Sequence, residues 1–66
     1  TDNPGLSRAQ RVELQKLLNR NGFNVGEPDG KVGPATREGI RKAEARHGLP
    51  VTGRPSWNVY SVLGGK

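Results

Sequence analysis

The first third of the chain carries apolar residues at a helical period. They recur at the i, i+3, i+4 spacing of one helix face, with one more just ahead of the pattern: Leu6, Leu14, Leu17 and Leu18. Ser7 and Gln10 have the spacing of a capping box, in which the two side chains satisfy free backbone amides at a helix start. Gly22 accepts the left-handed conformation that closes a helix. The pattern therefore predicts a helix from about Ser7 to Asn21.

A second helical pattern occupies the middle of the chain. Pro34 suits the first position of a helix and Gly48 is placed to close it, which predicts a helix from about Pro34 to His47. Its inward stripe is expected to be Thr36, Ile40, Ala43 and His47. Its solvent side is expected to be mostly charged: Arg37, Glu38, Arg41, Lys42, Ala45 and Arg46.

A third, shorter helix is predicted from about Ser56 to Leu63. A helix with so few turns allows two alternatives for its buried face. One is Trp57, Tyr60 and Leu63, and the other is Val59, Val62 and Leu63.

The segments between the helices are rich in glycine and proline. Residues 22–33 hold four glycines and one proline without a helical period, and three apolar anchors favour an ordered loop: Phe23, Val25 and Val32. The segment from Leu49 to Pro55 has the same features on a smaller scale: an apolar anchor, a proline, a glycine turn and a second proline. The expected fold is all-α, a small three-helix bundle with ordered Gly/Pro-rich connecting loops. We expect a single domain over residues 1–66, with flexible ends at 1–6 and 64–66.

Composition narrows the classes of partner. The formal net charge of +5 favours an anionic partner, such as nucleic acid, a lipid surface or a polymer with carboxylates or phosphates. No apolar run approaches the length of a membrane span, so membrane insertion is not expected. The chain has no cysteine, which leaves neither disulfides nor thiolate ligands to stabilise it.

The residues that could perform chemistry are few. His47 is the only histidine, so neither a zinc site nor a Ser-His-acid arrangement is expected. The turn at Gly30 lacks the carboxylates of a calcium loop, and Glu27 with Asp29 has no cleft in which to flank a sugar as an acid/base pair. We therefore expect no catalytic residue, no metal and no cofactor.

Several short motifs occur in a family-specific order. They are Leu14-Gln15 with Leu18, then Gly22-Phe23, then Asp29-Gly30-Lys31-Val32-Gly33-Pro34-Ala35-Thr36, then Gly48-Leu49 and Thr52-Gly53. Together they resemble the peptidoglycan-binding domain family of three-helix modules, over about Leu14 to Leu63. The stretch from Gly48 to Ser56 is most similar to the version at the C-terminus of lytic murein transglycosylases of the membrane-bound B type. The chain departs from the family at Ala43-Glu44, where an aromatic residue followed by glutamine is usual.

The resemblance implies a function. It implies a non-catalytic module that anchors a cell-wall hydrolase to murein, exported to the periplasm or cell envelope as part of a longer protein. The expected partner is peptidoglycan, through its glycan strand, its stem peptide or both, and the module is expected to be a monomer that binds no nucleic acid. The alternative is a basic three-helix nucleic-acid-binding domain, although its helices are farther apart along the chain than those of a helix-turn-helix.

The candidate ligand-binding residues are expected beside the loops that precede the second and third helices. They are Asp29, Arg41, Arg54, Trp57, Asn58 and Tyr60. Two of them have a competing structural role. Asp29 in a Pro-Asp-Gly turn is expected to bind its own backbone. Trp57 is a candidate to fill the core space that Ala43 leaves, in which case it is no ligand platform.

Overall fold

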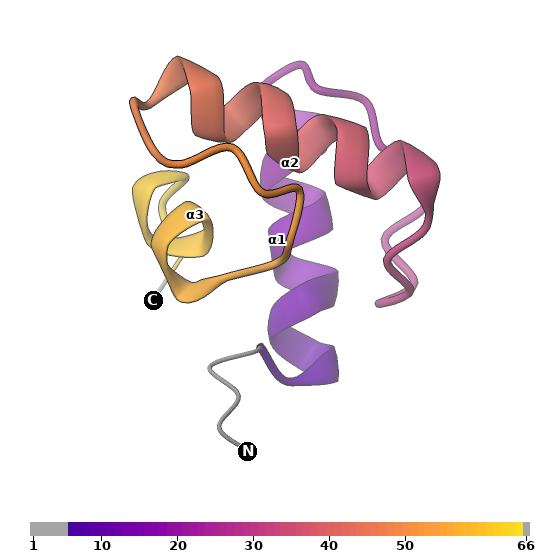
Figure 1. The fold of residues 1–66 in the computed structure, drawn as a ribbon. Helices are drawn as coiled ribbons and strands as arrows, with labels where there is room; N and C mark the ends of the chain where they lie inside the picture. The colour runs from indigo at the N-terminus through magenta and orange to yellow at the C-terminus, as the bar shows by residue number, and fades with distance from the viewer. Residues whose placement is uncertain (1–5, 66) are drawn as a thin grey trace.

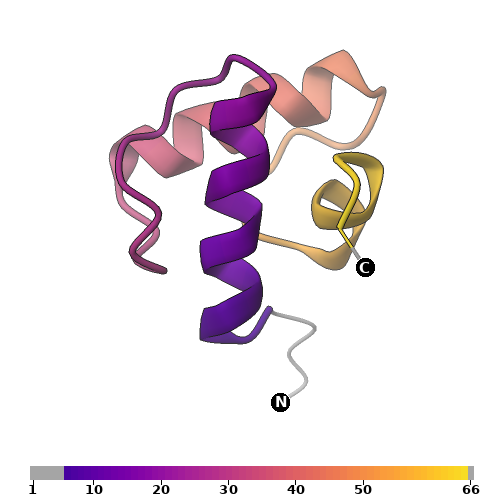
Figure 2. The same ribbon diagram turned by 180° about the vertical axis from the view of Figure 1, so that it is seen from behind.

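The computed structural model describes residues 6–65, which form three α-helices and no strand. They are α1 (Arg8–Arg20), α2 (Pro34–Arg46) and α3 (Trp57–Val62). In Figures 1 and 2, α2 lies across the C-terminal end of α1, and α3 lies beside α1, below the C-terminal end of α2. α2 contacts both other helices. The expected all-α fold and the three helical segments are confirmed.

The start of α1 is fixed by the capping box. The Ser7 Oγ accepts from the Gln10 backbone N–H at 3.2 Å, and the Ser7 backbone N–H donates to the Gln10 Oε1 at 2.9 Å. Two amides that the helix itself leaves free are therefore satisfied reciprocally. α3 begins in a simpler way, since the Ser56 Oγ accepts from the Val59 N–H at 3.4 Å.

The first two helices end with the same glycine-containing arrangement of backbone hydrogen bonds. At the end of α1, the Gly22 N–H donates to the Asn19 carbonyl and the Phe23 N–H to the Leu18 carbonyl, at 3.1 and 2.9 Å. Gly22 has φ of 88°, the left-handed value that this Schellman arrangement requires. The end of α2 repeats the two bonds through Gly48, which has φ of 72°, and Leu49.

One hydrophobic core joins the three helices and the first loop. Its buried members are Leu6, Leu14, Leu17, Leu18, Val25, Ile40, Ala43, Val59, Tyr60 and Leu63. Phe23 and Leu49 pack against it from the two loops. The inward face of α3 is Val59, Tyr60 and Leu63, which combines members of both stripes that the sequence allowed.

One core assignment from the sequence is wrong, that of His47, and the core alternative for Trp57 is not the one that the structure has. His47 is exposed, because α2 ends before it and the chain turns back at Gly48. Leu49 packs on the core instead, as the apolar residue after a Schellman turn commonly does. Trp57 is 48% exposed, whereas Ala43 is fully buried, so the core closes around Ala43 without the tryptophan.

Where the structure describes them, both ends of the chain make contacts with the rest of the domain. Leu6 is buried, and its carbonyl accepts from the Arg11 Nη1 at 2.8 Å. The Gly64 and Gly65 N–H groups donate to the carbonyls of Ser61 and Tyr60, at 3.0 and 2.8 Å. Residues 1–5 and 66, the remainder of the two expected flexible ends, lie outside the described residues.

Candidate functional site

A buried glutamine holds the loop that precedes α2. Gln15 is 1% exposed, and its Oε1 accepts from the Gly30 N–H at 2.7 Å. Its Nε2 donates to the Lys31 carbonyl at 2.8 Å and to the Thr36 Oγ1 at 3.1 Å. One amide side chain thus fixes both the turn before α2 and the first turn of α2 itself. Both polar atoms of this buried side chain have hydrogen-bond partners, as is usual for buried polar groups.

A buried glutamate does the same for the loop that precedes α3. Glu44 is 2% exposed, and its Oε1 accepts from the N–H groups of Thr52 and Gly53, at 2.8 and 2.9 Å. Its Oε2 accepts from the Thr52 Oγ1 at 3.0 Å. Three donors aimed at one carboxylate offset the loss of its hydration.

Gln15 and Glu44 are not predicted from the sequence to anchor these loops. Their spacing to apolar residues could nevertheless have indicated that both are buried. Gln15 lies next to Leu14 and three residues before Leu18, and Glu44 lies four residues after Ile40. These spacings place both polar side chains on the buried helix face.

The loop that Glu44 holds forms one wall of a basic hollow, which we call the arginine groove. α2 forms the other wall, and the volume is about 490 Å³. The groove is lined by Val32, Arg37, Arg41, Thr52, Gly53, Arg54 and Pro55. Its three arginines are exposed, and none of the acidic residues within 6–65 lines it. The groove is therefore suited to anionic groups, which guanidinium binds by paired hydrogen bonds.

Arg41 lies directly over the loop. A Cβ at Gly53 would come within 3.1 Å of the Arg41 Nε, so the bare backbone at this position allows the guanidinium to approach. The Arg41 Nη1 donates to Glu38 Oε1 at 2.9 Å, in an ion pair with both side chains about half exposed. A pair so exposed to water is weak, which leaves Arg41 able to exchange Glu38 for an anionic ligand.

A smaller hollow of about 220 Å³ adjoins the arginine groove and shares Thr52 and Arg54 with it. Its other lining residues are Glu44, Leu49, Pro50, Ser56 and Asn58. Three of the six candidate residues, Arg41, Arg54 and Asn58, therefore line these two neighbouring hollows, beside the loop before α3.

Asp29 lies elsewhere, in a separate hollow of about 240 Å³ that also contains Gln15 and Lys31. Its Oδ1 accepts from the Lys31 N–H at 2.8 Å, which confirms that this carboxylate binds its own turn. The same hydrogen bond holds the pKa of Asp29 below its ordinary value, because it stabilises the charged form.

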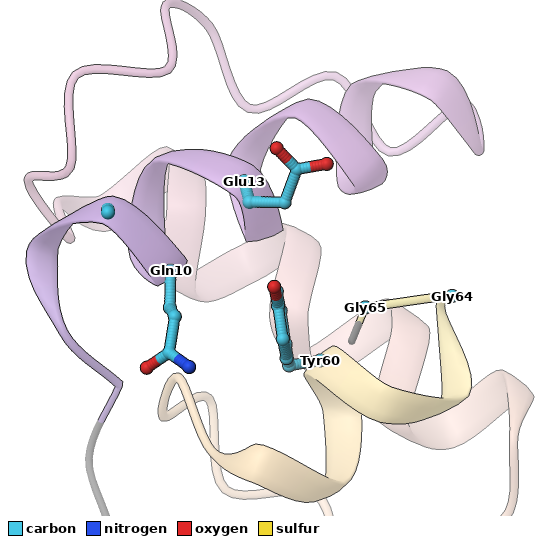
Figure 3. A pocket seen from close by; sticks show the side chains of 6 residues that line it. Gln10, Glu13, Tyr60, Gly64 and Gly65 are labelled. Atoms are coloured by element: carbon cyan, nitrogen blue, oxygen red, sulfur yellow. The ribbon is translucent and has the colours of Figure 1, made fainter.

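The two aromatic candidates lie on α3, next to α1. Tyr60 lines a hollow of about 450 Å³, which we call the α1–α3 hollow, together with Ala9, Gln10, Glu13, Gly64 and Gly65. Figure 3 shows the Tyr60 side chain standing between the two helices, with its hydroxyl end directed toward α1. The Trp57 ring lies 5.3 Å from the Tyr60 ring, centroid to centroid, at 46°.

Within residues 6–65, no group of three or more His, Cys, Asp or Glu side chains is arranged to hold a metal ion. No helix of this region is long and apolar enough to cross a membrane.

Comparison with known proteins identifies the relatives of this fold. A family model described as "Putative peptidoglycan binding domain" matches residues 7–63. Two crystal structures of SltB3 from Pseudomonas aeruginosa, in complex with NAG-anhNAM-pentapeptide and with NAG-NAM-pentapeptide, are 40% and 39% identical to the chain. Their TM-scores are 0.83 and 0.86, and the matches cover 88% and 94% of this chain.

A curated protein from Synechococcus elongatus, "Putative OxPP cycle protein OpcA", is 41% identical over 51 residues, or 77% of the chain. All of these relatives are much longer. The chain spans 16% and 17% of the two SltB3 chains and 12% of the Synechococcus protein.

Proposed function

The chain belongs to the peptidoglycan-binding domain family, and on this premise we propose that it is a non-catalytic module that attaches a cell-wall lytic enzyme to murein. The family match over residues 7–63 and the SltB3 likeness support this proposal. Attachment raises the local concentration of an enzyme on its polymer without new chemistry. The module would act in the periplasm or cell envelope, as a monomer.

The arginine groove is the observation that carries the proposal. Three arginines, Arg37, Arg41 and Arg54, line one depression at the surface. A stem peptide ends in a carboxylate, and the SltB3 ligands include pentapeptides. Carboxylates pair with arginine by two parallel hydrogen bonds. The groove is therefore proposed to bind the anionic part of peptidoglycan, with Asn58 in the adjoining hollow as a donor and acceptor for amides.

A lytic transglycosylase is the proposed parent. The two SltB3 matches cover more of the chain than the Synechococcus match does, at 88% and 94% against 77%. They also agree with the resemblance of the segment from Gly48 to Ser56 to the membrane-bound B type of these enzymes.

Nucleic-acid binding is the alternative that the charge alone would allow. In the structure, residues 21–33 separate α1 from α2, and residues 47–56 separate α2 from α3. A helix-turn-helix joins its helices by about 3–4 residues. The spacing therefore argues against a helix-turn-helix, and we propose no nucleic-acid role.

Sedimentation with purified sacculi tests the proposal. The domain should pellet with sacculi at low salt and release no soluble fragments from them. The double variant Arg41→Gln/Arg54→Gln should reduce the pelleted fraction, and Lys16→Gln/Arg20→Gln, which removes two exposed charges from α1, is the matched control. Retention should fall with salt, because the Debye length shortens from about 10 Å at 0.1 M to about 3 Å at 1 M.

Two results would overturn the proposal. One is a wild-type domain that stays in the supernatant with sacculi of several chemotypes. The other is equal loss of binding in both double variants, since this would mean that net charge acts without the groove. A gel shift with duplex DNA, run in parallel, measures the alternative.

A further inference from the structure

Trp57 is a large apolar side chain that the core does not use. It is 48% exposed, while the core residue Ala43, whose space it was expected to fill, is fully buried without it. A single exposed apolar side chain is common in proteins and is no evidence by itself. Its surroundings are therefore what decides whether it has a role.

The Trp57 ring lies beside Tyr60, which lines the α1–α3 hollow. The two rings lie 5.3 Å apart, and Tyr60 lines the hollow although only 5% of its surface is exposed. The volume of about 450 Å³ falls in the range of about 300–1,000 Å³ that is usual for small-molecule sites. An exposed indole thus stands beside a depression that already has an aromatic wall.

The polar groups of the hollow come from α1. Gln10 and Glu13 line it from one side (Figure 3). The Gln10 Oε1 is used in the capping box, which leaves its amide N–H₂ as a donor, and the Glu13 carboxylate is an acceptor. Among residues 6–65, no lysine or arginine lines the hollow. The described part of its lining therefore differs from that of the arginine groove and suits an uncharged ligand with hydroxyl and amide groups.

A bare backbone keeps the wall of the hollow open. The Gly65 N–H donates to the Tyr60 carbonyl at 2.8 Å, which folds the chain back against the tyrosine ring. A Cβ at Gly65 would lie 2.5 Å from the ring carbon Cε2. Any side chain here would displace the ring or the chain that covers it, so the shape of the hollow depends on glycine.

We propose that the α1–α3 hollow, together with the Trp57 ring beside its Tyr60 wall, is a glycan subsite that binds the N-acetylated sugars of the murein strand, separate from the arginine groove. The inference rests on the proposed function and deepens it. The C–H face of a pyranose is weakly positive and packs on the electron-rich face of an aromatic ring. Gln10 and Glu13 then hydrogen-bond to hydroxyl and acetamido groups, while the arginine groove binds the anionic peptide.

Trp57 supplies its own assay, because it is the only tryptophan in the chain. The probe is the β-1,4-linked tetramer of N-acetylglucosamine, which carries neither peptide nor charge, and the cellulose tetramer is the control sugar. Titration of the wild-type domain with the probe should shift Trp57 emission in a saturable way. The cellulose tetramer should bind more weakly, since it lacks acetamido groups.

Variants separate this subsite from the groove. Glu13→Gln and Gly65→Ala keep the reporter, and each should weaken probe binding about tenfold, equivalent to about 1.4 kcal/mol. Trp57→Ala, followed by calorimetry or NMR, should weaken it at least as much, and Val51→Ala, which removes another exposed apolar side chain, should not. Arg41→Gln/Arg54→Gln should bind the probe as the wild type does. Circular dichroism verifies that each variant is folded.

The outcomes distinguish this inference from the proposed function. If the domain pellets with sacculi but the probe leaves Trp57 emission unchanged, the glycan subsite is wrong while the attachment function stands. If the arginine double variant loses the probe, the two sites are one and the separation is wrong. If the wild-type domain does not pellet with sacculi, the proposed function itself falls.

Discussion

Glu44 is the residue whose replacement tests most directly how the arginine groove is held. Glu44→Ala removes the acceptor of three hydrogen bonds and leaves the buried Gly53 N–H without a partner. An unsatisfied buried donor costs about 1–3 kcal/mol, and the two Thr52 donors, which water can reach, add less. We expect a loss of about 2–4 kcal/mol in total, a large share of the stability of a small domain.

Glu44→Gln is the matched variant. Both backbone N–H groups bind the same oxygen, Oε1, so a glutamine can keep them, and its Nε2 can donate to the Thr52 Oγ1. We therefore expect a change within about 1 kcal/mol, because the variant loses charge-assisted hydrogen bonds but also the cost of a buried charge.

Thermal melts followed by circular dichroism measure both variants. For a domain of this size about 1 kcal/mol corresponds to about 4–8 °C, so Glu44→Ala should melt about 10–30 °C below the wild type. It should also lose sacculus binding, since Gly53 supports Arg41. The reasoning is refuted if Glu44→Ala melts like the wild type. It is also refuted if Glu44→Gln melts as low as Glu44→Ala, because the charge would then be indispensable.

Three further outcomes are expected. Trp57→Ala should lower the free energy of unfolding by about 1–2 kcal/mol, less than the loss of about 3–5 kcal/mol expected for a buried aromatic side chain. The emission of Trp57 in the native wild type should resemble that of free indole, and a strongly blue-shifted emission would contradict its exposure. Because the pKa of Asp29 is lower in the folded chain, its stabilising contribution is present above about pH 4 and is lost as the pH falls through the folded pKa. The melting temperature of Asp29→Asn should therefore depend less on acid than that of the wild type, and identical acid profiles would argue against the turn. EDTA should leave the melting temperature unchanged, whereas a drop of several degrees would reveal a metal site.

The sequence predicted those parts of the structure that short-range interactions fix. The capping box joins Ser7 to Gln10 across three residues, and Gly22 closes α1 through bonds to the preceding turn. The Asp29 turn spans two residues. Such interactions lie within the reach of one helical turn or one tight turn, so their spacing is visible in the chain itself. For the same reason the three helix ranges were correct to within a residue or two.

Contacts between distant segments decided the rest. Gln15 reaches Gly30 across 15 residues and Glu44 reaches Gly53 across nine, and neither partner can be read from local spacing. The exposure of Trp57 follows from which face of α3 meets the core, a choice that six helical residues leave open. The arginine groove exists because the loop after α2 folds back along that helix, which brings Arg54 to the same hollow as Arg37 and Arg41. Helices are encoded by neighbouring residues, whereas a surface that binds a ligand arises from the packing of elements that are far apart in the sequence.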